Sequence, residues 1–456
     1  MAIAKTMNEN TKQFTLAHAD DDVRQLALKG CRDAEVDFPM ALQQISGRQA
    51  AQTKIPSWAK LDDIRYPVHL SMEQCSSEAT ALYKVRLVKS VIFSNNLISP
   101  IAAKSPYRKL VDLTGGFGVD FAFLCELFDE GVYVERDETL CALAHHNFQV
   151  LSQKTPMESM KRPELESPMD VLNFSVVHAE AETFLHRMEE HVTLIFIDPA
   201  RRDKHGARTY SLGDCTPDVL PLMDELLRKS DYVLLKLSPM LDWRKAMADV
   251  GTEHVEQVHI VAVGGECKEL LLLLSANGSQ QPQLVCSNDD RQEVFTLKTG
   301  KDPDIASETS ITSETSMTST TSITSETRTT GKALENAPLF LYEPHAALMK
   351  GGFFEELAHR YGVTPLAPNS HLFTSDKLVD NFPGRTFRVT AVSTMNKQEL
   401  KEKVMPIKQA NISVRNFPMS VDALRKKLKL SEGGNTYLFA TTLVDGSHIL
   451  LLGSKL

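Results

Sequence analysis

The fold of this chain is decided by the stretch Lys109-Leu-Val-Asp112-Leu-Thr-Gly115-Gly116-Phe-Gly118-Val-Asp120. The stretch is predicted to run from a short buried strand, through a glycine-rich turn, into the first turn of a helix. Glycine lets a backbone approach a ligand closely, and a helix N-terminus offers free N–H donors. This combination predicts a binding site for a nucleotide-like ligand.

A second carboxylate follows the turn at a spacing that suits ribose recognition. The next strand ends in Glu135, seventeen residues beyond Gly118, where a carboxylate can accept hydrogen bonds from both ribose hydroxyls. A dinucleotide fingerprint would place a third glycine where this chain has Phe121, so the sequence disfavours NAD. A tight strand-to-helix turn without a ligand is the alternative interpretation.

The rest of the chain is predicted to form several parts around this turn. Short apolar runs alternate with helical stretches from about residue 108 to residue 280, which predicts an α/β fold with a parallel, doubly wound sheet. The predicted parts are a helical N-terminal domain (1–95), the α/β domain (96–280), a connecting α+β region (281–385) and a small α+β C-terminal domain (386–456). A Ser/Thr-rich hexad is repeated four times over residues 305–328, which predicts a disordered loop.

Composition narrows the class of protein. The 456 residues are 42% hydrophobic and 24% charged, as in ordinary soluble globular proteins. The longest apolar runs are too short to span a bilayer and the polar start has no signal-peptide core, so we expect a cytoplasmic enzyme. The seven cysteines include no CxxC pair, and the histidines lack ligand spacing, so neither a disulfide framework nor a metal site is expected.

The fourth strand of the predicted sheet delivers Asp198-Pro199-Ala200-Arg201 at its carboxyl end, where open α/β sheets place their chemistry. Asp198 is expected beside the reacting group, with Pro199 next to it. Arg201 could bind a phosphate or carboxylate through its planar fork of donors, or be a surface arginine without a partner. Lys236 is expected to point toward the same cleft, and Tyr210 could supply an aromatic ring there.

The acid, the glycine turn and the second acid resemble the class I methyltransferases that bind S-adenosylmethionine. The resemblance implies that the first acid and the turn lie beside the methionine part of the cofactor and that the second acid binds the ribose. The implied cofactor residues of this region are Asp112, Thr114, Gly115, Gly116, Gly118, Glu135 and Arg136.

Two further segments receive roles from the same resemblance. An acid after the third strand commonly accepts the adenine amino hydrogen, which points to Glu180 with Ala181 beside it; a carboxylate favoured by the helix dipole is the alternative. A polar segment before the first core strand often closes over the methionine end, which points to Gln74 and Ser76; helix capping alone would also explain that segment. Asp198-Pro199 resembles the start of the Asp-Pro-Pro-aromatic motif that holds a target amine, with Ala200 and Arg201 in place of the last two residues.

The whole chain resembles one family, the uncharacterised bacterial class I methyltransferases with a THUMP-like C-terminal domain. The segments that carry this resemblance are QCSSEAT, DLTGGFGVD, DPARRD, VGGECKELLL, LYEP and VRNFPMSVDALRKKL. THUMP domains belong to RNA-modifying enzymes, so the resemblance implies an RNA substrate such as tRNA or rRNA. The implied reaction is in-line methyl transfer to a substrate atom near Asp198, which would accept a proton where one is released.

Local charge agrees with an RNA partner. The chain has a net charge of −9, yet the segment from Arg385 to Lys429 carries eleven lysines and arginines against three acids. Basic side chains on one face attract RNA phosphates, and the helix 421–428 is the expected face; a solvated Lys-rich helix is the alternative. A methyltransferase for a small molecule or protein, and an inactive RNA-binding protein that retains the fold, remain competing functions.

Overall fold

The computed structural model describes residues 7–93, 107–153, 172–201, 212–297, 338–367 and 369–456. The chain forms two compact units. The first comprises Met1–Val263, Lys268–Leu284 and Thr296–Thr299, and the second Gly264–Cys267, Val285–Phe295 and Gly300–Leu456. The hexad repeat over residues 305–328, for which we expect disorder, lies outside the described residues.

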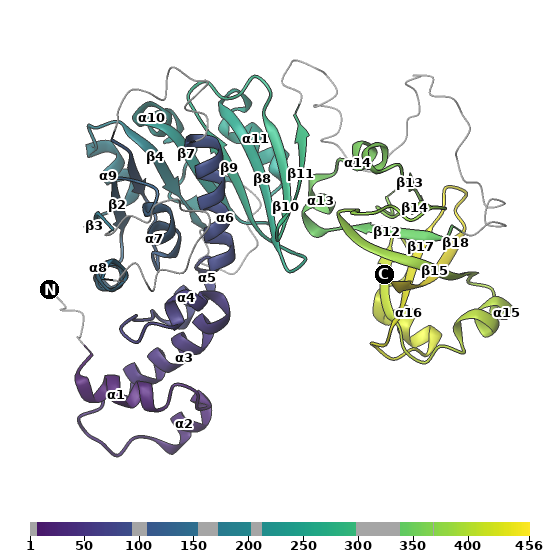
Figure 1. Cartoon of the computed structure of the whole chain (residues 1–456), viewed down its shortest axis with the longest axis horizontal. Coiled ribbons are helices and arrows are strands. Elements are labelled where there is room, and N and C mark those ends of the chain that lie inside the picture. The colour runs from purple at the N-terminus through teal and green to yellow at the C-terminus, as the bar shows by residue number, and fades with distance from the viewer. Residues whose placement is uncertain (1–6, 94–106, 154–171, 202–211, 298–337, 368) are drawn as a thin grey trace. The chain divides into compact units, whose positions relative to one another are not determined.

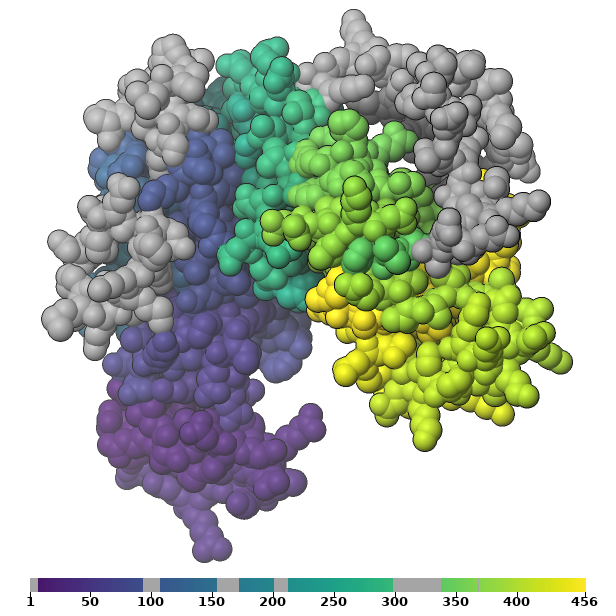
Figure 2. Space-filling view, turned by 45° about the vertical axis from the view of Figure 1, so that its right-hand side comes forward, coloured from purple at the N-terminus to yellow at the C-terminus, as the bar shows by residue number. Residues whose placement is uncertain are grey.

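The first unit begins with helices whose starts are set by short polar side chains. Asn8, Asp22, Asp37 and Ser77 each accept a backbone N–H of the turn that follows, as N-cap residues do. In both views α1 and α2 lie at the end of the unit away from the teal strands (Figures 1 and 2). The helices are α1 (Glu9–Ala17), α2 (Val23–Lys29), α3 (Phe38–Lys54), α4 (Pro56–Ala59), α5 (His69–Gln74) and α6 (Glu78–Val88), followed by the π-helical turn η1 (Lys89–Phe93).

A nine-stranded sheet runs through the α/β part in the order β11-β10-β8-β9-β7-β4-β1-β2-β3. Its strands are β1 (Lys109–Asp112), β2 (Glu130–Glu135), β3 (Phe174–His178), β4 (Val192–Ile197), β7 (Ser230–Leu237), β8 (Val255–Val263), β9 (Glu266–Leu274), β10 (Gln283–Asn288) and β11 (Arg291–Thr296). The five strands β3, β2, β1, β4 and β7 are parallel, which confirms the predicted α/β class. A separate short pair joins β5 (Ala200–Arg201) to β6 (Cys215–Thr216).

Helices cover both faces of this sheet, with α6 in front of it and α11 behind it in Figure 1. The helices that connect its strands are α7 (Val119–Cys125), α8 (Glu138–Ser152), α9 (Ala181–Arg187), α10 (Met223–Lys229) and α11 (Trp243–Val250). Residues of α6, α7 and α8 share one core with Leu194 and Phe196 of β4. Trp58 of α4 joins that core and meets the ring of Phe117 with centroids 5.2 Å apart. The N-terminal helices therefore pack against the glycine turn within one unit.

The prediction of a wholly parallel sheet is wrong beyond β7. Strand β9 pairs with β7 in antiparallel register, from Val233 opposite Leu274 to Leu237 opposite Leu270. The neighbouring β8 reaches β9 through only Gly264 and Gly265, both at positive φ (60° and 81°). Two-residue turns with both central residues at positive φ favour a hairpin, and glycine adopts that conformation most readily. The sheet is therefore mixed, because β8 and β9 form a hairpin and not a parallel pair.

The second unit contains a seven-stranded sheet of order β13-β14-β12-β15-β18-β17-β16. Its strands are β12 (Phe340–Pro344), β13 (Thr364–Pro365), β14 (Phe373–Ser375), β15 (Gly384–Thr394), β16 (Asn411–Arg415), β17 (Thr436–Thr442) and β18 (His448–Lys455). Its helices are α13 (Ala346–Gly351), α14 (Phe354–Tyr361), α15 (Lys397–Glu399) with the π-helical turn η6 (Leu400–Val404), and α16 (Val421–Leu428). Among the described strands of this sheet, β16 and β17 form a parallel pair, and the other neighbouring strands pair in antiparallel fashion. The small α+β arrangement of its last 70 or so residues is the predicted one. Within the described ranges of either unit, no helix has the length and apolar character needed to cross a membrane.

Candidate active site

The parallel strands reverse their chain order between β1 and β4. Open α/β sheets bind ligands in the crevice outside the carboxyl ends of the strands at such a point. Strand β1 ends at Asp112, β2 ends at Glu135, and Asp198 comes directly after β4. The structure therefore brings these three predicted acids to one edge of the sheet.

The three glycines of the turn differ in the reason why glycine is needed at each position. A Cβ atom on Gly115 would lie 2.0 Å from a ring carbon of Tyr133, and one on Gly118 would lie 2.7 Å from the ring of Phe148. Close packing therefore excludes a side chain at both positions. Gly116 has a φ of +55°, and a Cβ atom built on it would have its nearest neighbour, the Thr114 carbonyl oxygen, 3.8 Å away. There is therefore open space on this side of the Gly116 backbone. This half-buried turn beside three acids is the feature that fits a nucleoside ligand.

Glu135 is held beside this turn by the backbone on both sides. Its Oε2 accepts the N–H of Gly116 at 2.8 Å, and its Oε1 accepts the N–H of Asp137 at 2.9 Å. Each carboxylate oxygen has a second lone pair, so the oriented group can still accept hydrogen bonds from two ribose hydroxyls. This arrangement is compatible with the ribose-binding role expected for the half-buried Glu135.

Asp112 is a buried carboxyl, only 1% exposed. Its Oδ1 accepts the N–H of Thr114 at 2.9 Å, and the Thr114 hydroxyl oxygen accepts the N–H of Asp198 at 2.7 Å. Burial raises the pKa of Asp112 well above its usual value, and the nearby carboxylates Asp120, Asp198 and Glu135 raise it further. A ligand with positive charge near Asp112 would favour the ionised form, as the amino group and sulfonium of S-adenosylmethionine would.

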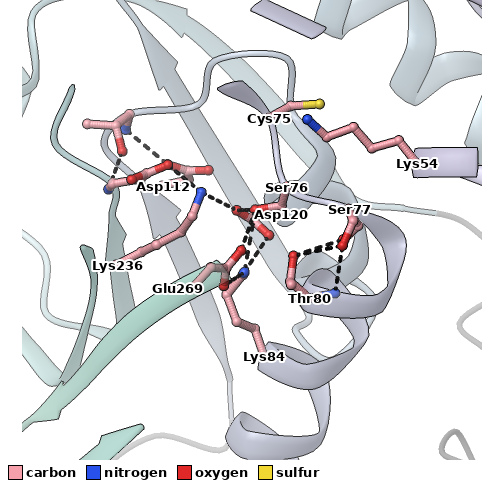
Figure 3. Close-up of polar contacts among 12 residues, drawn as sticks. Lys54, Cys75, Ser76, Ser77, Thr80, Lys84, Asp112, Asp120, Lys236 and Glu269 are labelled. Carbon is pink, nitrogen blue, oxygen red and sulfur yellow. Dashed lines mark hydrogen bonds and ion pairs between the residues drawn. The ribbon is translucent and has the colours of Figure 1, made fainter. Parts of the chain in front are cut away.

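A buried charge cluster adjoins these acids, formed by Ser76, Lys84, Asp120, Lys236 and Glu269 (Figure 3). Lys84 of α6 is fully buried, with its Nζ 3.1 Å from Asp120 Oδ1 and 2.5 Å from Glu269 Oε2. The Ser76 hydroxyl donates to Asp120 Oδ2 at 2.6 Å. The cluster therefore joins the N-terminal helices, α7 and β9.

Lys236 connects this cluster to Asp198. Its Nζ lies 2.5 Å from Asp198 Oδ2 and 3.4 Å from Asp120 Oδ2. Burial alone would lower the pKa of Lys236, but Asp198, Asp120 and Glu269 raise that pKa well above its usual value. Burial raises the pKa of Asp198, and the Lys236 ammonium opposes this rise. Because the Asp198 side chain is 35% exposed, its second oxygen can reach a substrate.

The charges of the cluster and of Asp198 do not balance. Three carboxylates, Asp120, Asp198 and Glu269, face two ammonium groups, and Asp112 lies close to two of these acids. Burial would raise the pKa of Asp120, but Lys84, Lys236 and Ser76 together hold it below its usual value. Among the side chains that the structure describes, these groups therefore carry excess negative charge, which suits a cationic cofactor.

The remaining predicted residues take varied positions. Pro199 is buried beside Asp198, whereas Gln74 and Arg136 are exposed. Glu180 is the exposed residue before α9, its side chain makes no capping hydrogen bond, and Ala181 is buried behind it. The backbone of Arg201 lies in β5, but its side chain and the whole of Tyr210 lie outside the described residues.

The two adjacent serines before α6, Ser76 and Ser77, have different structural roles. Ser77 is the N-cap of α6 and its side chain accepts the N–H of Thr80 at 3.2 Å. Ser76 is buried, and its hydroxyl contacts the buried charge cluster instead. Capping therefore explains Ser77 but not Ser76.

Sequence reasoning missed Lys84, Asp120 and Glu269 as site residues. One signal was present, because Lys84 interrupts the apolar helix ALYKVRLV and Glu269 begins the apolar run ELLLLL. Charged residues in such surroundings are almost never fully buried unless they are paired. As for metals, no group of three or more His, Cys, Asp or Glu side chains able to hold an ion occurs in the described ranges.

Comparisons with known proteins place this geometry in a family. Residues 384–455 match the family described as THUMP domain-like, and residues 340–383 match a ferredoxin-like domain. A proposed methyltransferase from Porphyromonas gingivalis W83 is 30% identical, over 99% of this chain and 100% of that chain, with a TM-score of 0.74. No curated protein matches the chain significantly.

More distant solved structures include a proposed class I S-adenosylmethionine-dependent methyltransferase from Listeria monocytogenes, 13% identical over 66% of this chain and 97% of that chain, with a TM-score of 0.35. An rRNA methylase from Streptococcus thermophilus is 12% identical over 37% of this chain and 86% of that chain, with a TM-score of 0.25. The family assignment rests on the Porphyromonas protein, because these two TM-scores are below 0.5. This chain belongs to the family of that protein, the proposed methyltransferases, and carries a THUMP-like C-terminal domain.

Proposed function

We propose that this protein transfers the methyl group of S-adenosylmethionine to a structured RNA, such as tRNA or rRNA. The observation that carries the methyltransferase part is the set of Asp112, Glu135 and Asp198 around the open backbone of Gly116, at the point where the strand order reverses. The THUMP-like match and the basic segment 385–429 support the RNA part.

The residues of this chain would act mainly by positioning. S-adenosylmethionine supplies a methyl group on a sulfonium, which needs no further activation. Glu135 would orient the ribose, and Asp112 would stabilise the positive charge of the methionine part. Lys236 holds one oxygen of Asp198, so the other would accept a hydrogen bond or a proton from the target atom. Orientation of this kind is the main catalytic resource of a transfer that needs no covalent intermediate.

The direct test of the RNA substrate is mass spectrometry of modified nucleosides in total RNA from a strain that lacks the gene. We expect one methylated nucleoside to be absent from that strain and restored by the parent gene. Restoration should fail with the Asp198→Ala gene. An unchanged nucleoside profile would contradict an RNA substrate and favour a small-molecule or protein acceptor.

The cofactor site can be tested without knowing the acceptor. Calorimetry with S-adenosylhomocysteine should show one site per chain, and Glu135→Ala should weaken binding by about 1 to 3 kcal/mol because two ribose hydroxyls lose a charged acceptor. Glu138→Ala, which removes an exposed acid three residues away, serves as the matched control and should bind like the parent. Equal affinity of the Glu135→Ala variant would remove Glu135 from the site.

The structure refines the expected RNA face on α16. Leu424 and Leu428 are buried, and Arg425 donates to the carbonyl oxygen of Ala410 at 3.2 Å. Arg425 is therefore held within the second unit, whereas Lys426 and Lys427 are exposed. These two lysines are the side chains of α16 that can meet a phosphate without breaking an internal hydrogen bond.

Charge reversal of Lys426 and Lys427 to glutamate should therefore flatten the salt dependence of RNA binding. The slope of log K against log salt should fall by roughly 0.7 to 0.9 for each phosphate that the protein no longer neutralises. The matched control reverses Lys29 and Lys60, which are exposed in the first unit. The same slope in the α16 variant and the parent would leave α16 a solvated helix.

A further inference from the structure

A buried glutamate of the second unit holds two arginines from separate strands. Glu343 of β12 is only 3% exposed. Arg385 lies opposite it in the register of β12 and β15, and its Nε and Nη2 both donate to Glu343 Oε2, the first at 2.7 Å. Arg415, the last residue of β16, donates from Nη2 to Glu343 Oε1 at 2.8 Å. Both oxygens of the carboxylate are therefore occupied by guanidinium groups.

This group of three carries one uncompensated positive charge. One carboxylate neutralises one guanidinium, and among the described residues neither Arg385 nor Arg415 forms an ion pair with another acid. The pair of arginines therefore attracts an anion.

Hydrogen-bond donors also remain. A guanidinium has five N–H donors. Among the described residues, Arg385 uses Nε and Nη2 for Glu343 and Arg415 uses Nη2, so Nη1 of each arginine has donors left for a ligand. The side chains of Arg385 and Arg415 are 46% and 33% exposed, so an approaching ligand can reach them.

The guanidinium groups of Arg385 and Arg415 are also held in fixed orientations. Glu343 holds one edge of the Arg385 guanidinium through Nε and Nη2, and it holds the Arg415 guanidinium through Nη2. The carbon at the centre of the Arg385 guanidinium lies 5.6 Å from the ring centroid of Phe387 and 5.9 Å from that of Tyr437. An arginine held in this way loses little conformational freedom when it binds, and its planar fork matches the oxygens of a phosphate. Phosphate is the anion that an RNA partner presents repeatedly.

We propose that Arg385 and Arg415, oriented by Glu343, bind a backbone phosphate of the RNA substrate. The proposal rests on the RNA function proposed above and names a site for it apart from α16. Glu343 lies in the segment that matches the ferredoxin-like domain, and both arginines lie in the THUMP-like segment. The site is thus complete only when both segments are present, which explains why a buried acid holds the two arginines across their boundary.

The test uses Arg415→Met in the full chain, because this change leaves Glu343 paired with Arg385. Binding of fluorescein-labelled, unfractionated transfer RNA is measured by anisotropy over a series of salt concentrations. We expect affinity to fall roughly 10- to 100-fold at low salt, the effect typical of removing one charge-assisted hydrogen bond, and the salt slope to fall by about 0.7 to 0.9. The matched control is Arg388→Met on β15, the strand of Arg385. Arg388 is exposed and lies over the ring of Phe340 at 5.2 Å, and this variant should retain the parent slope.

A second variant separates charge from geometry and covers a failure of Arg415→Met to fold. Arg415→Lys keeps the positive charge and the pair with Glu343 but loses the planar fork, so affinity should fall while the salt slope stays near that of the parent. If folded Arg415 variants bind the RNA as the parent does, with equal affinity and slope, the phosphate site is wrong although the RNA function stands. If the parent itself binds no RNA, both the site and the proposed RNA function are overturned.

Discussion

Replacement of Lys84 by methionine is expected to lower the free energy of unfolding of the first unit by about 3 to 5 kcal/mol, because it leaves buried carboxylates without their cation. Lys84 is fully buried between Asp120 and Glu269. Methionine is of similar length and keeps the packing, so the loss reports the charge. Both tryptophans, Trp58 and Trp243, belong to the first unit. Urea denaturation followed by tryptophan fluorescence therefore measures this unit separately from the second.

Two further variants make the Lys84 result interpretable. Lys245→Met removes a lysine whose side chain is 55% exposed and paired with Asp249 on α11, and it should change the free energy of unfolding by less than about 1 kcal/mol. Adding Glu269→Gln to Lys84→Met should recover part of the lost stability, because one unpaired charge is then removed. A Lys84→Met variant as stable as the parent would show that the cluster is not held as described.

Replacement of Asp198 by alanine is expected to lower single-turnover methyl transfer by about 100-fold or more, as for loss of a positioned proton acceptor. The acceptor is RNA from the strain that lacks the gene, and the methyl group of the cofactor is radiolabelled. Affinity for S-adenosylhomocysteine should stay near the parent value, since Asp198 faces the acceptor rather than the ribose in the proposed arrangement. Full activity of Asp198→Ala would move the chemistry to another residue.

The pH dependence of the same reaction tests the role of Lys236. Burial raises the pKa of Asp198, and Lys236 opposes that rise. Lys236→Met should therefore raise the pKa of Asp198 further, and the acid limb of the pH profile should move to higher pH, since Asp198 must be ionised to accept a proton. A merely structural loss would lower activity at every pH without moving that limb.

Sequence alone predicted that Asp112, the glycine turn and Glu135 lie together, because they belong to consecutive elements. The structure places them at one edge of the sheet, and their role toward a ligand is part of the proposed function. The buried charge cluster follows from no local rule, because Lys84 and Glu269 are 185 residues apart. The sequence shows that each is a charged residue in an apolar run, but only the folded sheet shows that they are partners.

The wrong prediction at β8 and β9 has a different cause. Both strands are continuous apolar runs, which are typical of strands buried on both faces and occur in parallel sheets. The connection carried the deciding information, since only Gly264 and Gly265 separate the strands and a crossover helix needs many more residues. The length of the connection should therefore outweigh the apolar pattern of the strands when their direction is predicted.

The separation of Lys84 from Glu269 has a consequence for synthesis on the ribosome. At roughly 5 to 20 residues per second, translation over the sequence separation of 185 residues takes on the order of 10 to 40 seconds. During that interval α6, and later the glycine turn, are synthesised before β9, the strand that carries Glu269. The first unit is therefore expected to reach its native packing late, after β9 leaves the exit tunnel, and chaperones that bind exposed apolar helices have their longest opportunity before that moment.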